Sequence, residues 1–189
     1  MKIIFSNLLV IIILVLFSCT NSNVKISTED NFKIVELPDG STAYLNNNSS
    51  IKYNKYFDER IIEQKGEVFF EVTKGTAPFI VKTEVGEIQV LGTKFNVKSS
   101  NKELDVEVEE GIIELKINKF IKEIKKGQKA FFKRNQNSIQ ISNAELKHKK
   151  WLNSLDKELK ELGKTILKDS KKIRKDVKKE LKKFKKKLN

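Results

Sequence analysis

The chain of 189 residues contains one cysteine, one histidine and two prolines. A single cysteine excludes a disulfide within the chain. One cysteine and one histidine are also too few ligands for most familiar zinc sites. Two prolines argue against a proline-rich, low-complexity chain. Hydrophobic residues make up 39% of the sequence and include 12 phenylalanines, which is enough for a core. The length favours one domain with additional segments.

Positive charge is concentrated at the C-terminal end of the chain. Residues 147–189 contain 18 Lys and Arg and 6 Asp and Glu, a net charge of +12. Residues 1–146 contain 20 Lys and Arg and 19 Asp and Glu, a net charge of +1. This asymmetry indicates that the two parts have different roles.

The residue types give little support for catalysis. His148 stands alone in a lysine-rich segment, so we expect a solvated surface side chain rather than a general base. Glu67 and Glu71 are expected on the solvent face of a strand, and the Glu107–Glu110 cluster on a charged sheet surface, with a cation site there as the weaker alternative. The sequence therefore predicts no enzyme, no cofactor, no metal site and no small-molecule substrate.

The N-terminal segment has the features of an export signal. Lys2 precedes an apolar run whose unbroken part, residues 8–17, spans only about half of a roughly 30 Å hydrocarbon core. Leu16-Phe17-Ser18-Cys19 resembles the lipobox of bacterial lipoproteins, in which the cysteine is acylated and the signal is cut before it. An ordinary secreted protein or a short membrane anchor is the alternative. Residues 19–31 are polar and are expected to form a flexible tether.

Residues 32–141 show the alternation typical of antiparallel strands. The stretch from Gly66 to Val97 contains three short strands separated by glycine-marked turns. Pro38-Asp39-Gly40 predicts a hairpin turn. Further alternating runs give roughly ten strands, which indicates an all-β antiparallel sandwich, roll or β-solenoid. The Phe69-Phe70 pair is expected to send one ring inward, and the other ring could form an exposed apolar patch.

Short motifs follow one another in a fixed order between residues 35 and 132. They include Leu37-Pro38-Asp39-Gly40-Ser41, Gly66-Glu67-Val68-Phe69-Phe70-Glu71-Val72 and Val90-Leu91-Gly92-Thr93-Lys94-Phe95-Asn96-Val97. Their key residues are Asp39, Gly40, Gly66, Phe70, Pro78, Gly92, Thr93, Phe95, Gly111 and Gly127. In this order and spacing they resemble the FecR domain, the periplasmic β domain of FecR-type sigma-factor regulators.

The resemblance implies a role in cell-surface signalling. Members of this family usually hold a sigma factor in the cytoplasm and sense a TonB-dependent outer-membrane receptor, often one for iron-siderophores. Because only 18 residues precede Cys19, we expect this chain to lack the N-terminal anti-sigma region. Any signal would then pass through a partner that spans the membrane.

The spacing of the apolar residues changes after residue 141. Ser142 and Glu145 resemble a capping box, so a helix is predicted over residues 142–189. Ten apolar residues from Leu152 to Leu188 fall within an arc of about 100°, and this stripe does not drift, as in a straight helix. At roughly 70 Å, such a helix cannot all pack against the β region. A hairpin near Gly163 or partial fraying is the alternative.

Lysines that flank an apolar arc are typical of a helix lying on an anionic membrane surface. The residues expected in this contact are Lys171, Lys172, Arg174, Lys175, Lys178, Lys179, Lys182 and Lys183. A protein partner and a solvated helix are the alternatives. Facing rows of lysine oppose a self-dimer, and export argues against nucleic acid.

Together these features predict a non-enzymatic lipoprotein of the bacterial envelope. It has a signal peptide (1–18), a tether from lipidated Cys19 (19–31), a FecR-like all-β domain (32–141) and a long basic amphipathic α-helix (142–189). We expect it to be exported and lipid-anchored at the periplasmic face or the outer membrane as a protein-binding or regulatory module. The alternative is a component of FecR-type signalling, with sigma and anti-sigma regulation linked to TonB-dependent iron-siderophore uptake. An envelope protein partner is expected in both cases.

Overall fold

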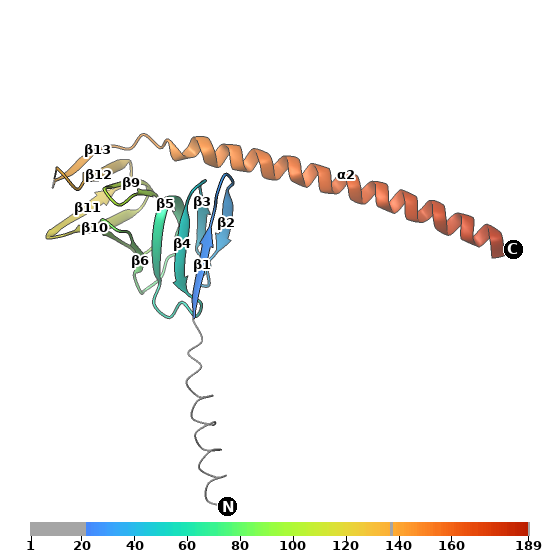
Figure 1. The fold of residues 1–189 in the computed structure, drawn as a ribbon, viewed down its shortest axis with the longest axis horizontal. Coiled ribbons are helices and arrows are strands. Elements are labelled where there is room, and N and C mark those ends of the chain that lie inside the picture. Colours follow the sequence, from blue (N-terminus) through green and yellow to red (C-terminus); the bar gives the residue numbers. More distant parts are fainter. Residues whose placement is uncertain (1–21, 137, 189) are drawn as a thin grey trace, which may run out of the picture.

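The computed structural model describes residues 22–136 and 138–188, which form thirteen strands and one long helix (Figure 1). The strands are β1 (Asn23–Ser27), β2 (Lys33–Glu36), β3 (Thr42–Leu45), β4 (Ser50–Asn54), β5 (Ile61–Glu71), β6 (Phe79–Lys82), β7 (Glu87–Val90), β8 (Lys94–Ser99), β9 (Glu103–Glu110), β10 (Ile112–Ile117), β11 (Phe120–Lys125), β12 (Gln128–Lys133) and β13 (Ile139–Asn143). The helix is α2 (His148–Leu188).

The strands form one strongly bent sheet in two halves, and β5 runs through both. One half has the order β1-β4-β5-β6-β7-β10-β11, and the other has the order β2-β3-β5-β8-β9-β12-β13. Strand β5 pairs with β4 and β6 through its first residues, and with β3 and β8 after them. The β5–β6 pair is parallel, whereas the other pairs of the described strands are antiparallel. The all-β prediction is confirmed, as a nearly closed roll.

Gly66 lies where β5 passes from one half of the sheet to the other. Its φ is +85°, and a Cβ there would lie 2.6 Å from the Asn48 carbonyl oxygen and from Ser49 Oγ. Only glycine adopts this conformation and leaves room for that approach. The backbone N–H of Glu67 donates to Ser49 Oγ over 2.9 Å, which fixes the crossing. The glycine expected between two strands therefore lies within one continuous strand.

The two halves of the sheet enclose a single apolar core. The alternating side chains Val68, Phe70 and Val72 are buried, as their spacing predicts. Phe70 contacts Phe79 and Phe95, with ring centroids 6.0 Å and 5.4 Å away. Because such pairs are favourable beyond the area that they bury, these rings hold the two halves together.

The structure corrects both ends of the predicted β domain. Strand β1 lies within the expected tether and pairs with β4 from Asn23 to Ser27, and Val24 and Ile26 pack against the core. At the other end, Ser142 lies in β13 opposite Lys129, so it caps no helix. One short alternating run is too brief a signal to separate a strand from a polar linker, and strand pairing overrides the capping motif.

Helix α2 runs from His148 to Leu188 as one continuous element of 41 residues. It passes through Gly163 without a break, so the alternative of a hairpin there is wrong. Its first turns lie on the β roll and the remainder extends well beyond it, as its length predicts (Figure 1). Across the two described ranges, no helix combines the length and the apolar character needed to span a membrane.

Candidate functional site

The motif residue Asp39 has a structural role. Arg60 approaches its Oδ2 with Nη2 at 2.7 Å and Nε at 2.8 Å. The same guanidinium donates to the carbonyl oxygens of Thr73 and Ala77, each over 2.8 Å, and lies 5.4 Å from the centre of the Phe79 ring. Arg60 thus ties the β2–β3 turn to the connection between β5 and β6.

A second group of motif residues joins the two halves of the sheet. A Cβ at Gly92 would lie 2.8 Å from Lys74 Cα, and Thr93 Oγ1 donates to the Ile112 carbonyl over 3.1 Å. Gly111, with a φ of +86°, turns β9 into β10 beside them. The other motif positions lie in turns, beside a strand or in the core: Gly40, Gly66, Phe70, Pro78, Phe95 and Gly127. These residues build the fold, so the interaction site must be sought elsewhere.

Buried polar groups gather instead where α2 lies on the sheet. We call this sheet surface the helix seat and define it by Phe32, Glu67, Phe69, Glu107 and Glu109. Most of these side chains come from β5 and β9, and they contact His148, Lys149 and Trp151 in the first turn of α2. The next turn adds the buried Leu155.

His148 is the most deeply buried polar residue of the seat, with 1% of its surface exposed. Its ring stacks on Phe69, with centroids 4.9 Å apart and planes 17° apart. Its Nδ1 lies 3.4 Å from Glu107 Oε2, and its Nε2 lies 3.2 Å from Glu109 Oε2. The expectation of a solvated histidine is therefore wrong, because the helix start turns this ring onto the sheet.

Trp151 completes the seat through the Glu67 carboxylate. Its Nε1–H donates to Glu67 Oε1 over 3.1 Å, and its ring stacks on Phe32 with centroids 5.9 Å apart. Glu67 also accepts from Asn96 Nδ2 at 3.1 Å and from Asn46 Nδ2 at 3.0 Å. Three N–H donors from separate elements suit an ionised carboxylate. Glu67 is half-buried in this contact and not a purely solvent-facing charge.

The acidic cluster of β9 is occupied by cations of the chain itself. Lys149 Nζ lies 2.9 Å from Glu109 Oε1. Burial alone would raise the pKa of Glu109, but Lys149 and His148 outweigh it and hold that pKa below its usual value. Lys129 Nζ lies 2.7 Å from Asp105. Even with this cation beside it, burial raises the pKa of Asp105. Within residues 22–136 and 138–188, no group of three or more candidate ligands is arranged for a metal ion.

Phe69 and Glu71 also depart from the pattern expected on β5. Phe69 is 4% exposed, so both rings of the Phe69-Phe70 pair are buried. Its cover comes from His148, which is distant in sequence, and no local pattern predicts that contact. Glu71 is half-buried and lies 3.2 Å from Lys94 Nζ. The position of His148 continues the apolar stripe of the helix backward from Leu152, and this is the signal that could have located the seat.

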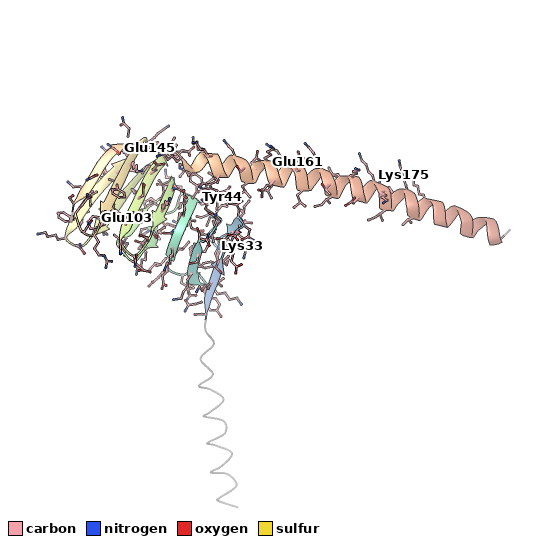
Figure 2. All side chains as sticks on the ribbon, turned by 45° about the horizontal axis from the view of Figure 1, so that its top comes forward. Lys33, Tyr44, Glu103, Glu145, Glu161 and Lys175 are labelled. Atoms are coloured by element: carbon pink, nitrogen blue, oxygen red, sulfur yellow. The ribbon has the colours of Figure 1, made fainter. Side chains whose placement is uncertain are left out.

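Beyond the seat, the apolar stripe of α2 is uncovered as far as Val177, the last of its side chains that the structure describes. Leu155 is 7% exposed, but the exposed fraction rises to 46–62% at Leu159, Leu162, Ile166, Ile173 and Val177. A hollow of about 400 Å³ marks the corner between the sheet and the helix, lined in part by Ile34, Tyr44 and Leu159. In Figure 2, Tyr44 lies near this corner, whereas Glu161 and Lys175 lie on the projecting part of α2.

The basic residues expected in the helix contact lie on this projecting part. Lys171, Lys172, Arg174, Lys175 and Lys178 are exposed. The side chains of Lys179, Lys182 and Lys183 lie outside the described part of the structure, as does Cys19.

Comparison with known proteins gives one family and one set of similar structures. Residues 24–114 match the family model described as FecR protein. Two crystal structures of a "putative anti-sigma factor" from Parabacteroides distasonis ATCC 8503, at 2.50 and 1.65 Å resolution, align with TM-scores of 0.61 and 0.64 at 29% identity. The alignments cover 64% and 68% of this chain and 60% and 64% of theirs, so the chain spans less than two thirds of their length. A search of curated proteins returned no match.

The bent β roll and its turn network define a β domain of the kind found in anti-sigma-type regulators. More particularly, residues 24–114 match the FecR family model, so this part of the chain resembles a FecR domain. The family and its structural relatives support a regulatory role that involves protein partners.

Proposed function

We propose that this protein is a non-enzymatic lipoprotein of the bacterial envelope, whose FecR domain is a regulatory module that binds other proteins. The observation that carries the proposal is the FecR domain combined with Cys19 at the end of a short apolar segment. Residues 1–18 serve as the signal peptide. The lipid on Cys19 holds the β roll at the periplasmic face or the outer membrane, where a FecR domain meets its partners.

Lipidation is tested at Cys19. Cells that express the protein are labelled with palmitate, and the N-terminal peptide of the mature product is analysed by mass spectrometry. The proposal predicts an acylated peptide that begins at Cys19, and a Cys19→Ala variant without label. Retention of residues 1–18 in the mature chain, or unchanged labelling of the variant, would overturn the anchor.

The regulatory route tested first is FecR-type signalling through a membrane-spanning partner. It is supported by the relatives described as anti-sigma factors. Deletion of the gene should change the transcription of sigma-dependent targets, including those for iron-siderophore uptake, and the wild-type chain should restore it. If transcription is unchanged while the protein still binds an envelope protein, the chain is a scaffold and not a signalling component.

Contact between α2 and an anionic membrane surface stays a prediction. It is supported by the exposed lysines and apolar stripe of the helix. Each basic residue near an anionic leaflet contributes about 1 kcal/mol, which salt screens. Flotation with anionic vesicles at low salt, lost at high salt, would support this contact. The stripe faces the side of α2 on which the β roll lies, and this direction favours a protein partner over a membrane.

A further inference from the structure

The exposed stripe of α2 faces the side of the helix on which the β roll lies. Eighteen residues make five complete turns of an α-helix and advance it by about 27 Å. Ile166 therefore points in the same direction as His148, and Ile173 in the same direction as Leu155, both of which are buried on the sheet. The uncovered apolar surface is thus a direct continuation of the surface that already binds the seat.

The two borders of the stripe carry opposite charges. At 100° per residue, one border contains Lys160, Lys164, Lys171, Arg174 and Lys178, and Asp156 lies at its near end in an ion pair with Lys160. The other border contains the acidic residues Glu158 and Asp169. A surface of this kind selects its occupant by charge as well as by burial of apolar area.

A second copy of the chain fits this surface poorly. In an antiparallel pair of α2 helices, each border meets the same border of the other copy, so the row that contains Lys171 and Lys178 would face itself. A parallel pair would match opposite borders. Each β roll, however, lies on the stripe side of its own helix (Figure 1), so two rolls would compete for the space between the helices.

A flat membrane meets a similar obstacle. A bilayer lying along Leu159 and Ile166 would have to pass through the β roll, which projects from the same side of α2 (Figure 1). With the helix start held by His148 and Trp151, these side chains cannot enter an interface together. The corner instead holds a hollow of about 400 Å³ lined in part by Ile34, Tyr44 and Leu159.

We propose that the corner between the β2–β3–β5 face and α2 is a docking site for an amphipathic, acidic α-helix of another protein. Its apolar face would cover the stripe from Leu159 to Val177, and its acidic residues would lie against the basic border. An apolar side chain near one end would enter the hollow beside Ile34 and Tyr44. This inference names the kind of partner for the protein-binding module proposed above and rests on that proposal.

The test uses the full chain with Cys19→Ala and a fluorescent peptide of about five helical turns, with leucine on one face and glutamate along the one border that would meet the basic border of α2. Binding is followed by fluorescence anisotropy. The test variant is Ile166→Asn, and the matched control is Leu167→Asn. These two neighbouring side chains are 59% and 62% exposed, but Leu167 points 100° away from Ile166, toward the basic border and off the apolar stripe, and its replacement leaves the border's charges in place. We expect Ile166→Asn to weaken binding at least tenfold, and Leu167→Asn to change it less than twofold.

Three results would overturn the inference. The first is no binding of the acidic peptide, or equal losses in the two variants. The second is a dimer in sedimentation that Ile166→Asn abolishes, which would assign the stripe to a second copy. The third is flotation with vesicles of anionic phosphatidylglycerol that depends on Ile166 and not on Leu167, which would assign it to the membrane. Palmitate labelling at Cys19 and target transcription are measured separately, so failure here is distinct from failure of the proposed function.

Discussion

Replacement of His148 by alanine tests whether the helix seat fixes the direction of α2. The variant loses the stack on Phe69, which is worth about 0.5–1.5 kcal/mol. It also leaves Glu107, a carboxylate that is 5% exposed, without its imidazole partner, at about 1–3 kcal/mol. Together these losses amount to about 3 kcal/mol, which is roughly a hundredfold in the equilibrium between docked and undocked helix.

The single tryptophan of the chain reports this equilibrium directly. Trp151 is half-buried against Phe32 and is hydrogen-bonded to Glu67. We expect His148→Ala to shift its emission to the red and to speed amide exchange in the first two turns of α2. The β roll should keep its unfolding midpoint to within a few degrees, because no core side chain is removed.

A matched control lies five turns away on the same helix. Ile166→Ala points in the same direction as His148 but does not contact the roll, so Trp151 emission should be unchanged. The opposite result would be that His148→Ala leaves Trp151 emission and amide exchange in the helix unchanged while the whole protein unfolds at a much lower temperature. That result would make His148 part of the domain core and not of a separable seat.

Three further predictions follow from the fold and its charges. Gly66→Ala should prevent recovery of a soluble folded domain, because the new Cβ would meet the Asn48 backbone at a position with a positive φ. Gly163→Ala, in open space, should instead stabilise α2 by about 1 kcal/mol. Circular dichroism during heating measures both effects. Arg60→Lys should lower the stability of the β roll by roughly 2 kcal/mol in denaturant unfolding while Trp151 emission stays the same, since lysine cannot reproduce the fork that binds Asp39, Thr73 and Ala77. The pKa of Glu109 is lower in the folded protein than in the unfolded chain. Its contribution to helix docking is therefore complete above the usual glutamate pKa of about 4.3 and is lost as the pH falls through the folded pKa. An acid titration followed by Trp151 emission should show this loss, and Glu109→Gln should remove that part of the titration.

The sequence was sufficient for the repetitive parts of the fold. Alternation located the strands around Phe70 and Phe95, because half-buried strands impose a period of two. The stripe of α2 was visible for the same reason, with a period of 3.6. Gly66 and Gly92 were recognised as necessary, but the atoms that exclude a side chain there, on Asn48 and Lys74, became visible only in the structure.

The seat of the helix was not predicted, because its contacts join residues far apart in the chain. Trp151 and Glu67 are 84 positions apart, and His148 and Glu107 are 41 apart. A lone histidine among lysines has the local pattern of a surface residue. The burial of His148 follows from the path of the chain just before α2. There Leu146 has a φ of +49°, and the Glu145 N–H donates to Glu107. Such pairing depends on three-dimensional packing, which periodicity does not record.

Photocrosslinking in intact cells tests the central claim most directly, with a photoreactive amino acid at position 166 and the same residue at 167 as control. We expect position 166 to give an adduct with a second, different polypeptide, joined through an acidic helical segment, and position 167 to give little or none. Adducts from position 166 with lipid alone, or with another copy of this chain, would contradict it.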